Sequence, residues 1–486
     1  MNKNKIDTLI IGTGAGGAAA AAMAAGFGMD TLVLEKNARV GGSLAHYKKK
    51  GVRFDMGSHL FSRGERGPIG DLLRRWDIKS VDFLTLPIPA ASRGIFEIQL
   101  PPSKYGLPRF FLEAARGLGI PASEMMKVSR MFFNTLMSGK KHKKDLDNTT
   151  LHDFILSYTD YAPVYYMFSF LMGIYFVLPS WDVSAGEAIY SFSRQFRNYS
   201  LAYTRGGADA FVLALLDFAR SKGAEILTKT AVTGLTRRNG LWVAHTNDGR
   251  EFTARTVIST TGIKDTLRMV GEENVPAQWA EMVRNIKGSL NAYQVKAVLK
   301  RPLVKEGCII GGISLKGIRV QDLTIDDLNR STRDVIEGRV PDPMAMYAPI
   351  PTNFDPSLAP GGRQVILATI YGPTGPAKDP LEKWEKASLN AMNSVIPGFY
   401  DNLEFYDFID IKTMGKWMGK EGAPAISTGQ TIGQVGKDRP SSRTPLPGLY
   451  VAGDSAGGRG IGVELAVDSA IKCVEMLKMD MNNKKI

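Results

Sequence analysis

Hydrophobic residues alternate with glycine and small residues in a regular order at the start of the chain. The branched apolar run Ile6 to Ile11 has the length of a buried strand. A glycine-rich stretch, Gly12 to Gly17, comes next, and the alanine-rich segment 15–25 predicts a helix. The apolar run Thr31 to Leu34 predicts a second strand, which ends at Glu35. These residues therefore predict a strand–turn–helix–strand unit.

Similar patterns recur further along the chain. Segments 209–221, 382–396 and 462–477 have the periodicity of helices, and apolar runs of strand length lie at 225–228, 241–246, 251–259, 293–299 and 449–452. Strands that alternate with helices are typical of α/β proteins. We therefore predict an α/β protein, α+β as a whole.

The glycines of the first unit fall at the G-x-G-x-x-G spacing of a dinucleotide-binding turn, at positions 12, 14 and 17. Gly12 permits the tight turn, Gly14 lets a pyrophosphate approach the backbone, and Gly17 lets the helix pack closely on the strand. The helix N-terminus then offers unpaired N–H groups to the phosphates. Glu35, at the end of the second strand, is placed to accept hydrogen bonds from ribose hydroxyls. The unit predicts a dinucleotide site.

Composition limits what else the chain contains. With 486 residues it is long enough for two or three domains, and 44% hydrophobic and 22% charged residues are ordinary for a globular protein. Lys and Arg outnumber Asp and Glu by 61 to 48, which gives a net charge of +13. The two cysteines and five histidines lack metal-ligand spacing, so we predict no metal site and no disulfide framework. No recognition motif accompanies the basic charge, so nucleic acid is not an expected partner.

Two further stretches carry a family resemblance. Residues 35–42 read E-K-x-x-x-x-G-G, and residues 447–454 read P-G-L-Y-V-A-G-D. In both, the chain resembles the FAD-dependent oxidoreductases related to phytoene desaturase, carotenoid isomerase and retinol saturase, with the flavin amine oxidases as cousins. The two motifs lie near opposite ends of the chain and indicate FAD rather than NAD.

The resemblance implies a Rossmann-type FAD-binding domain and an inserted substrate domain of mixed sheet and helices. It also implies that the FAD-binding residues are Gly12, Gly14, Ala15, Gly17, Glu35, Lys36, Arg39, Gly42, Ser43, Gly57, Ser58, Val232, Thr260, Thr261, Gly453, Asp454, Ile461, Gly462 and Val463. We expect segments 1–85, 203–265 and 440–486 to form the FAD-binding domain. Segments 86–202 and 266–439 then form the substrate-binding, membrane-facing domain.

Two residues are candidates for catalysis. Residues 54–57 match the F-D-x-G segment that approaches the flavin ring in the resembled family, and Ser58-His59 follows where many carotenoid desaturases have proline. His59 is either a catalytic residue or a histidine whose hydrogen bonds are satisfied by the backbone of a turn. Glu464 lies in the first turn of the last helix, where it is either an acid near the flavin or a favourable charge at a helix start.

The middle of the chain suggests contact with lipid. Between residues 99 and 145, basic side chains are interleaved with bulky apolar ones, and the run Lys140 to Lys144 adds to the charge. The segment Tyr161 to Trp181 is rich in aromatic residues, but the prolines at 163 and 179 leave too few residues between them to span a bilayer. We expect residues 104–181 to include a peripheral membrane contact and a wall of an apolar substrate channel. The alternatives are an amphipathic helix pair packed on the core with a solvated loop at 140–144 and, for the aromatic segment, ordinary core.

Taken together, these patterns predict an oxidoreductase that moves a hydride between FAD and a hydrophobic polyene or isoprenoid, by desaturation, saturation or isomerisation of C=C bonds. Its electron partner would be a quinone, oxygen or a redox protein, and its location cytoplasmic, on the inner membrane face. The first alternative is an oxidase of amines or other small molecules. The second is a non-catalytic binding protein similar to the GDP-dissociation inhibitors.

Overall fold

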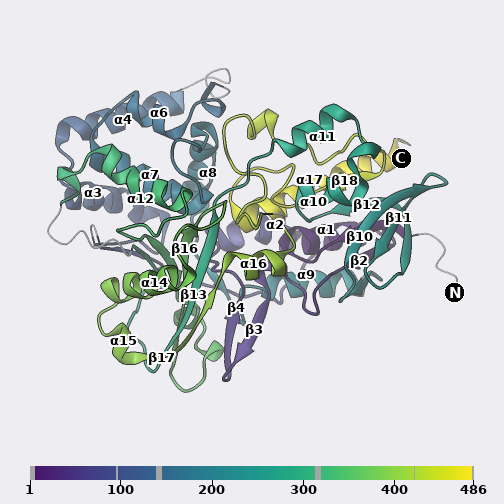
Figure 1. The fold of residues 1–486 in the computed structure, drawn as a ribbon, viewed down its shortest axis with the longest axis horizontal. Helices are drawn as coiled ribbons and strands as arrows, with labels where there is room; N and C mark the ends of the chain where they lie inside the picture. Colours follow the sequence, from purple (N-terminus) through teal and green to yellow (C-terminus); the bar gives the residue numbers. More distant parts are fainter. Residues whose placement is uncertain (1–5, 95–96, 138–144, 312–318, 421, 484–486) are drawn as a thin grey trace.

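The computed structural model describes residues 6–94, 97–137, 145–311, 319–420 and 422–483 of the chain. Two seven-stranded sheets organise these residues. Figure 1 shows the first sheet at the right, with both chain termini on that side, and the second at the lower left beneath a group of helices. The basic run from Lys140 to Lys144, part of the predicted membrane contact, lies outside the described residues.

The first sheet has the strand order β10-β11-β12-β1-β2-β9, with β18 paired to β12. Its strands are β1 (Ile6–Ile11), β2 (Thr31–Leu34), β9 (Glu225–Leu227), β10 (Val232–Arg238), β11 (Leu241–Thr246), β12 (Glu251–Ser259) and β18 (Leu449–Val451). β1 runs parallel to both of its neighbours, β12 and β2. The carboxyl ends of these central strands therefore meet at one edge, beside the glycine turn.

Helices α1 (Ala15–Gly26), α9 (Ala210–Ser221) and α17 (Gly462–Asn482) pack together against this sheet. All of α1 from Ala15 to Ala25 is buried, which explains its small residues. A Cβ atom added to Gly16 would lie 3.0 Å from Cα of Gly453. The two ends of the chain therefore meet at backbone distance. The other helices nearby are α2 (Pro68–Arg75), α10 (Ile263–Val270) and α11 (Ala277–Arg284).

The second sheet has the order β17-β13-β16-β15-β14-β6-β7. Its strands are β6 (Ala91–Arg93), β7 (Ile98–Gln99), β13 (Asn291–Leu299), β14 (Cys308–Gly311), β15 (Met346–Pro349), β16 (Gln364–Gly372) and β17 (Leu403–Ile409). All its pairings are antiparallel except that of β14 with β6. One face packs on α14 (Leu381–Val395) in a hydrophobic core, so the other face is free to line a cavity.

A group of helices covers the second sheet at the upper left of Figure 1. It consists of α3 (Leu107–Gly117), α4 (Ala122–Met137), α6 (Leu151–Leu156), α7 (Ala162–Phe176), α8 (Ala185–Arg197) and α12 (Ile325–Ile336). They share a hydrophobic core rich in aromatic side chains. The aromatic segment predicted at 161–181 forms α7. Within the described residues, no helix is long and apolar enough to cross a bilayer.

Several further elements complete the described structure. They include the hairpin β3 (His46–Lys49) and β4 (Val52–Asp55), the pair β5 (Phe83–Leu84) and β8 (Tyr203–Thr204), and the short helices α13 (Pro351–Phe354), α15 (Phe399–Asn402) and α16 (Ile411–Met418).

The predicted fold class is confirmed, and several predicted elements have the bounds that the sequence indicated. β1, β2, β11 and β12 coincide with the predicted strands, while α17 extends beyond the predicted end at 477 to Asn482. The predicted division between the domains at residue 265 falls inside α10. The segment 417–443 begins inside α16, and its following residues pass the glycine turn.

Candidate active site

A cleft of about 500 Å³ lies at the edge of the first sheet where its parallel strands end. It brings together the glycine turn after β1 and the residues after β18, which are far apart in the sequence. The predicted cofactor residues that line it are Gly12, Gly14, Ala15, Glu35, Lys36, Gly42, Ser43, Val232, Thr260, Thr261, Gly453, Asp454, Gly462 and Val463. The two predicted motifs therefore face one shared site.

The glycine turn has the geometry that its sequence demands. Gly12 has a φ of +97°, which favours glycine. A Cβ atom on Gly17 would lie 2.0 Å from the carbonyl oxygen of Gly12, so no other residue fits there without a backbone shift. Across the cleft, a Cβ on Gly42 would lie 3.1 Å from Cα of Gly14. The cleft wall here is bare backbone, as a bound pyrophosphate requires.

Two helix N-termini open into the cleft. Helix α1 begins after Gly14, and α17 begins after Ile461; neither N-cap residue supplies a side-chain hydrogen bond. The first-turn N–H groups of a helix have no intrahelical acceptors, and they carry a positive partial charge. Both helices therefore direct unsatisfied donors at the same space, where anionic or electron-rich groups of a cofactor would lie.

One end of the cleft presents an acid beside the start of β10. The Glu35 carboxylate is held by the backbone N–H of Thr13 at 3.0 Å and by the N–H of Asn37 at 2.8 Å. Val232 lies across from it in the cleft lining. Oε2 also accepts from the Thr13 hydroxyl at 2.5 Å, so the remaining acceptor capacity of Glu35, which suits a ribose hydroxyl, lies on Oε1.

Asp454 is fixed on the far side of the glycine turn. Its carboxylate accepts hydrogen bonds from Lys420 Nζ at 2.5 Å and from the N–H of Ser427 at 2.9 Å. Burial opposes ionisation, but the Lys420 ammonium and the Ser427 hydrogen bonds outweigh it and hold the pKa of Asp454 below its usual value. The residue is therefore a preformed anion that lines the cleft.

Helix α16 closes the cleft in a way that the sequence did not reveal. Lys36 Nζ donates to the carbonyl of Lys416 at 2.7 Å, and the Asn37 amide donates to the carbonyl of Trp417 at 3.1 Å. Trp417 Nε1 in turn donates to the carbonyl of Gly42 at 2.8 Å. These bonds join the loop after β2 to a segment about 380 residues later, and no local motif marks Trp417 or Lys420.

Five of the predicted cofactor residues do not line the cleft. Gly17 acts through the close packing described above, and Arg39 donates to the carbonyl of His46 at 2.6 Å. Gly57 and Ser58 line the neighbouring cavity. Ile461 precedes α17 and lies beside a small separate hollow.

A second cavity, of about 310 Å³, extends from the cleft between α7, α12 and the second sheet. Its surface is mainly apolar, with large contributions from Tyr166, Phe170, Ile174, Leu178, Trp181 and Met346. The cleft and the cavity share Ser43, His59, Met418, Ala425, Ile426 and Gly462. A cofactor in the cleft would therefore meet an apolar ligand in the cavity at these six residues.

His59 lies at this junction, and its ring is stacked on Gly57. A Cβ atom on Gly57 would lie 2.3 Å from Cε1 of His59, so the glycine makes room for the imidazole. Burial lowers the pKa of His59 to about 4. The ring is therefore neutral near pH 7 and is suited to hydrogen bonding and shape rather than to acid catalysis.

Glu464 has a different environment from the predicted acid beside the flavin. Its carboxylate forms a buried ion pair with Arg63 and accepts the N–H of Arg63 at 2.8 Å. Among the described residues that line the cleft or the cavity, Glu464 is absent. This arrangement supports the alternative interpretation, in which Glu464 is a favourable charge at a helix start. Its bonds to Arg63 also hold the segment after His59 in place.

Lys296 is a buried residue near the site that the sequence analysis missed. It lies on β13, is fully buried, and donates to the backbone carbonyls of Asp55 and Met56, the latter at 2.8 Å. Burial lowers its pKa to about 7. The second sheet thus holds the strand end that leads to Gly57 and His59, a contact that needs the tertiary fold.

The fold and the cleft define a class of protein. A mostly parallel sheet with a glycine turn, two helix N-termini aimed at one cleft and an adjoining apolar cavity fit FAD and a substrate side by side. The donors of α1, the bare backbone at Gly14 and Gly42 and the Glu35 carboxylate match the groups of FAD. The molecule is a flavin-dependent oxidoreductase.

The chain belongs to the family of flavin-containing amine oxidoreductases, whose family model matches residues 15–477. This result confirms the predicted enzyme class and the predicted cofactor, FAD. Prolycopene isomerase 1 from an Oncidium hybrid cultivar is 24% identical over 528 aligned positions, which cover 99% of this chain and 85% of that protein.

A human all-trans-retinol 13,14-reductase is 46% identical over 66 residues, which are 14% of this chain and 11% of that protein. Among solved structures, an oxidoreductase from Methanosarcina mazei matches with a TM-score of 0.73 at 19% identity, covering 96% of this chain and 100% of that one. The solved structure supports the fold.

Proposed function

We propose that this flavoenzyme acts on a hydrophobic polyene or isoprenoid, whose C=C bonds it desaturates, saturates or isomerises. The observation that carries the proposal is the aromatic, apolar cavity that opens directly onto the cofactor cleft at Ser43, His59 and Ile426. An unsaturated hydrocarbon chain buries well among such side chains. The names of the prolycopene isomerase and retinol reductase relatives support the same substrate class.

The roles of individual residues form part of the proposal. When bound, FAD supplies a hydride donor or acceptor at its N5 atom. Gly12, Gly14 and the α1 N-terminus bind the pyrophosphate, and Glu35 binds the ribose. The α17 N-terminus faces the flavin ring, while His59 shapes the junction and helps to exclude water. The predicted division into a discontinuous FAD-binding domain and a substrate domain is proposed on the same basis.

Anaerobic photoreduction tests this function. The purified holoenzyme is reduced with light under argon and then mixed separately with candidate polyenes, quinones, amines and oxygen, while the flavin absorbance near 450 nm is followed. The oxidised holoenzyme is mixed with the same compounds in parallel. The proposal predicts that a polyene is changed in one of three ways: a saturated product with reoxidation of the reduced flavin, a desaturated product with reduction of the oxidised flavin, or an isomer with the flavin still reduced. If oxygen alone reoxidises the flavin, and amines alone reduce it, the enzyme is an amine oxidase instead.

The amine oxidase alternative keeps some support from the family to which the chain belongs. The described residues that line the cavity include no Asp or Glu to pair with a protonated amine, whereas their aromatic rings suit either an amine or a polyene, so the photoreduction experiment separates the two. The non-catalytic alternative is tested by colour. A purified sample that stays colourless after FAD is added would support it.

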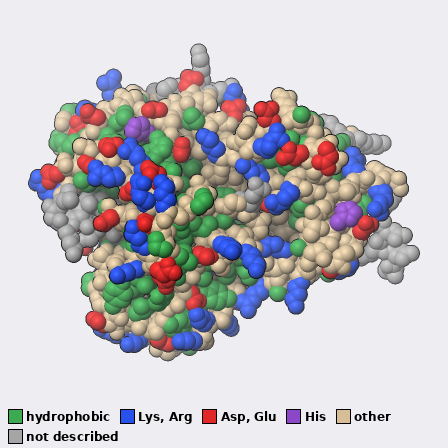
Figure 2. Space-filling view, viewed as in Figure 1, with side chains coloured by type: hydrophobic (Ala, Val, Ile, Leu, Met, Phe, Trp, Pro, Cys, Tyr) green, Lys and Arg blue, Asp and Glu red, His purple; other side chains and the backbone are tan. Residues whose placement is uncertain are grey.

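We propose that electrons enter or leave near α16, through a quinone, oxygen or a redox protein. Met414, Trp417 and Met418 on the inner side of this helix line the cleft or the cavity, whereas Lys412 and Lys416 are exposed on the outer side. Figure 2 shows Lys and Arg side chains gathered over this region near the centre of the view. A helix one layer thick therefore separates a basic surface from the cofactor site.

We also propose that the face formed by α3 and α4 contacts an anionic membrane from the cytoplasmic side. Tyr105, Met126 and Phe133 are 84%, 70% and 62% exposed there, next to the exposed Arg109 and Arg116. Exposed aromatic and basic side chains together suit the surface of a bilayer.

Vesicle flotation tests the membrane contact. The protein should float with phosphatidylcholine vesicles that contain phosphatidylglycerol, and Phe133→Ser should reduce the floated fraction. Met479→Ser, at a residue 57% exposed on α17, is the matched control. Equal flotation of the two variants, or none with anionic vesicles, would exclude this surface.

A further inference from the structure

One buried glutamine in the apolar cavity lacks a hydrogen-bond partner. Gln294 lies on β13, where Ala292 and Gln294 face the cavity while Tyr293 and Val295 pack into the core on the other side. Gln294 is only 5% exposed, yet its Oε1 atom has no hydrogen-bond partner among the described residues. Leaving such an atom unpaired costs about 1–3 kcal/mol, so a buried polar atom of this kind points to a ligand.

Gln294 is part of a polar row across the second sheet. In the strand register it stands opposite Thr369 on β16, and Thr369 stands opposite Tyr347 on β15. All three residues line the cavity. Thr369 Oγ1 donates to Ser58 Oγ at 2.7 Å, which ties the row to the residue before His59. The row therefore lies at the end of the cavity that meets the cofactor cleft.

Another polar cluster in the same cavity serves as a contrast. The hydroxyl of Tyr165 lies 2.5 Å from Ser180 Oγ and 2.8 Å from His152 Nδ1, and the Asn329 amide donates to it at 3.1 Å. These groups satisfy one another and need no ligand. Gln294 has no such neighbours, so the two clusters differ in what they leave available to a bound molecule.

We propose that Gln294 accepts a hydrogen bond from a hydroxyl group of the substrate, so that the enzyme acts on an isoprenoid alcohol rather than on a pure hydrocarbon. A hydroxyl supplies the donor that Oε1 lacks, and its own oxygen can accept from the Gln294 amide. This inference rests on the function proposed above.

A matched pair of ligands tests the inference on the holoenzyme. All-trans-retinol and the hydrocarbon that lacks its hydroxyl are titrated in turn, and binding is followed by flavin absorbance and tryptophan fluorescence. One buried hydrogen bond corresponds to roughly a tenfold difference in Kd, so the alcohol should bind about tenfold more tightly.

Variants locate the effect. Gln294→Met keeps the length of the side chain and should weaken binding of the alcohol about tenfold while leaving the hydrocarbon within about twofold. Gln321→Met is the control, since Gln321 lies outside both cavities and contacts the carbonyl of Leu118. The wild-type comparison decides the question even if Gln294→Met fails to fold.

The outcomes separate this inference from the proposed function. Equal affinity of wild type for alcohol and hydrocarbon, or an equal loss of both in Gln294→Met, overturns the hydroxyl contact. If the hydrocarbon reoxidises the photoreduced flavin and the alcohol does not, the proposed function stands and the inference fails. If no polyene of either kind is saturated, desaturated or isomerised, the proposed function itself fails.

Discussion

Backbone atoms and glycines form much of the cofactor cleft, whereas side chains of tyrosine, phenylalanine, leucine and methionine form the cavity beside it. In the cleft, Gly12, Gly17 and Gly42 set distances at which a methyl group would clash or crowd. In the cavity, side chains from α7, α12 and the second sheet together form the wall. The first site depends on the exact path of the chain, and the second on the sum of many apolar surfaces.

This difference has consequences for tolerance to substitution. A backbone turn that admits no Cβ atom has no way to relax locally, while an apolar wall can repack around residues of similar volume. We therefore expect substitutions in the cleft to abolish cofactor binding and conservative substitutions in the cavity to change substrate affinity only modestly. The following predictions test that contrast, from the largest expected effect to the smallest.

Gly17→Val should have the largest effect. Its Cβ would overlap the carbonyl oxygen of Gly12, so the turn must shift, at a cost on the order of 5 kcal/mol in stability. The variant should lose FAD, measured as the ratio of absorbance at 450 nm to that at 280 nm. Gly117→Ala is the control, because nothing lies within 4 Å of an added Cβ there. Normal FAD content in Gly17→Val would contradict the expectation that the cleft tolerates substitution less well than the cavity does.

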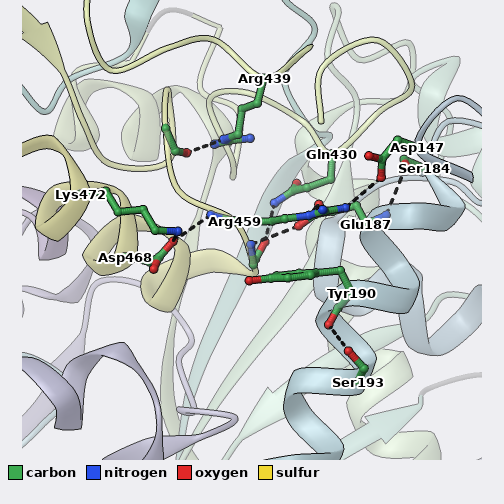
Figure 3. A network of polar contacts seen from close by, with 12 residues as sticks. Asp147, Ser184, Glu187, Tyr190, Ser193, Gln430, Arg439, Arg459, Asp468 and Lys472 are labelled. Atoms are coloured by element: carbon green, nitrogen blue, oxygen red, sulfur yellow. Dashed lines mark hydrogen bonds and ion pairs between the residues drawn. The ribbon is translucent and has the colours of Figure 1, made fainter. Parts of the chain in front are cut away.

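Arg459→Ala should have the second-largest effect, because Arg459 joins the loop before α17 to the group of helices that covers the second sheet. Figure 3 shows Arg459 between the loop before α17 and the helical group, where it pairs with Glu187 at 2.6 Å and Asp147 at 2.8 Å. Its guanidinium also lies 4.3 Å from the ring centroid of Tyr190. Without Arg459, the buried Glu187 carboxylate loses its charged partner. The free energy of unfolding measured in urea should then fall by about 3 kcal/mol.

The control for Arg459 is an exposed ion pair. Arg319 and Asp322 are 75% and 50% exposed in their side chains, so Arg319→Ala should change the unfolding free energy by less than about 0.5 kcal/mol. A similar loss of unfolding free energy in both variants would mean that Arg459 behaves as a surface charge and that other contacts join the loop before α17 to the helices.

Lys296→Met should alter the pH dependence of stability. Burial lowers the pKa of Lys296 to about 7, whereas an unfolded lysine keeps its proton until about pH 10. Between these values the unfolded chain binds more protons, so wild-type stability should rise with pH by roughly 1 kcal/mol per unit. Urea unfolding at pH 7 and pH 9 should show this rise in wild type and a flatter profile in Lys296→Met. Parallel profiles would contradict the assignment.

Phe170→Leu should have the smallest effect. Phe170 lines the cavity and stacks on Tyr166 with ring centroids 5.2 Å apart. Replacing it with a smaller apolar residue should weaken polyene binding by about 1 kcal/mol, or several-fold, and leave the FAD content unchanged. Fluorescence titration measures the first quantity and flavin absorbance the second. Loss of FAD would show that the cavity wall is as sensitive as the cleft.

The sequence predicted the cleft well because its chemistry is local. The motif lies within thirty residues and consists of Gly12, Gly14, Gly17 and Glu35. Its spacing alone predicts the turn, the helix and the acid. Asp454 was found through its family resemblance. Trp417 and Lys420 were missed, because their contacts with Gly42 and Asp454 join segments without any shared motif.

The cavity is where sequence reasoning reached its limit. The aromatic segment 161–181 was expected to be a channel wall or core, and α7 is partly both, since Tyr165 and Tyr166 belong to the hydrophobic core and also line the cavity. Nothing in the surrounding sequence indicates that Gln294 faces the cavity or that Lys296 donates a hydrogen bond to the carbonyl of Met56. The pairing of β13 with β16 and the approach of β4 decide their surroundings.

By itself, then, the sequence determined the α/β class, the glycine turn with the spacing of a dinucleotide site and the helix that begins at Gly462, because short-range spacing fixes turns, periodicity and helix starts. The tertiary structure decided that Glu464 is paired with Arg63, where the apolar cavity meets the cofactor cleft and which side chains line that cavity. Those properties arise from contacts between residues hundreds of positions apart, and no local pattern encodes them.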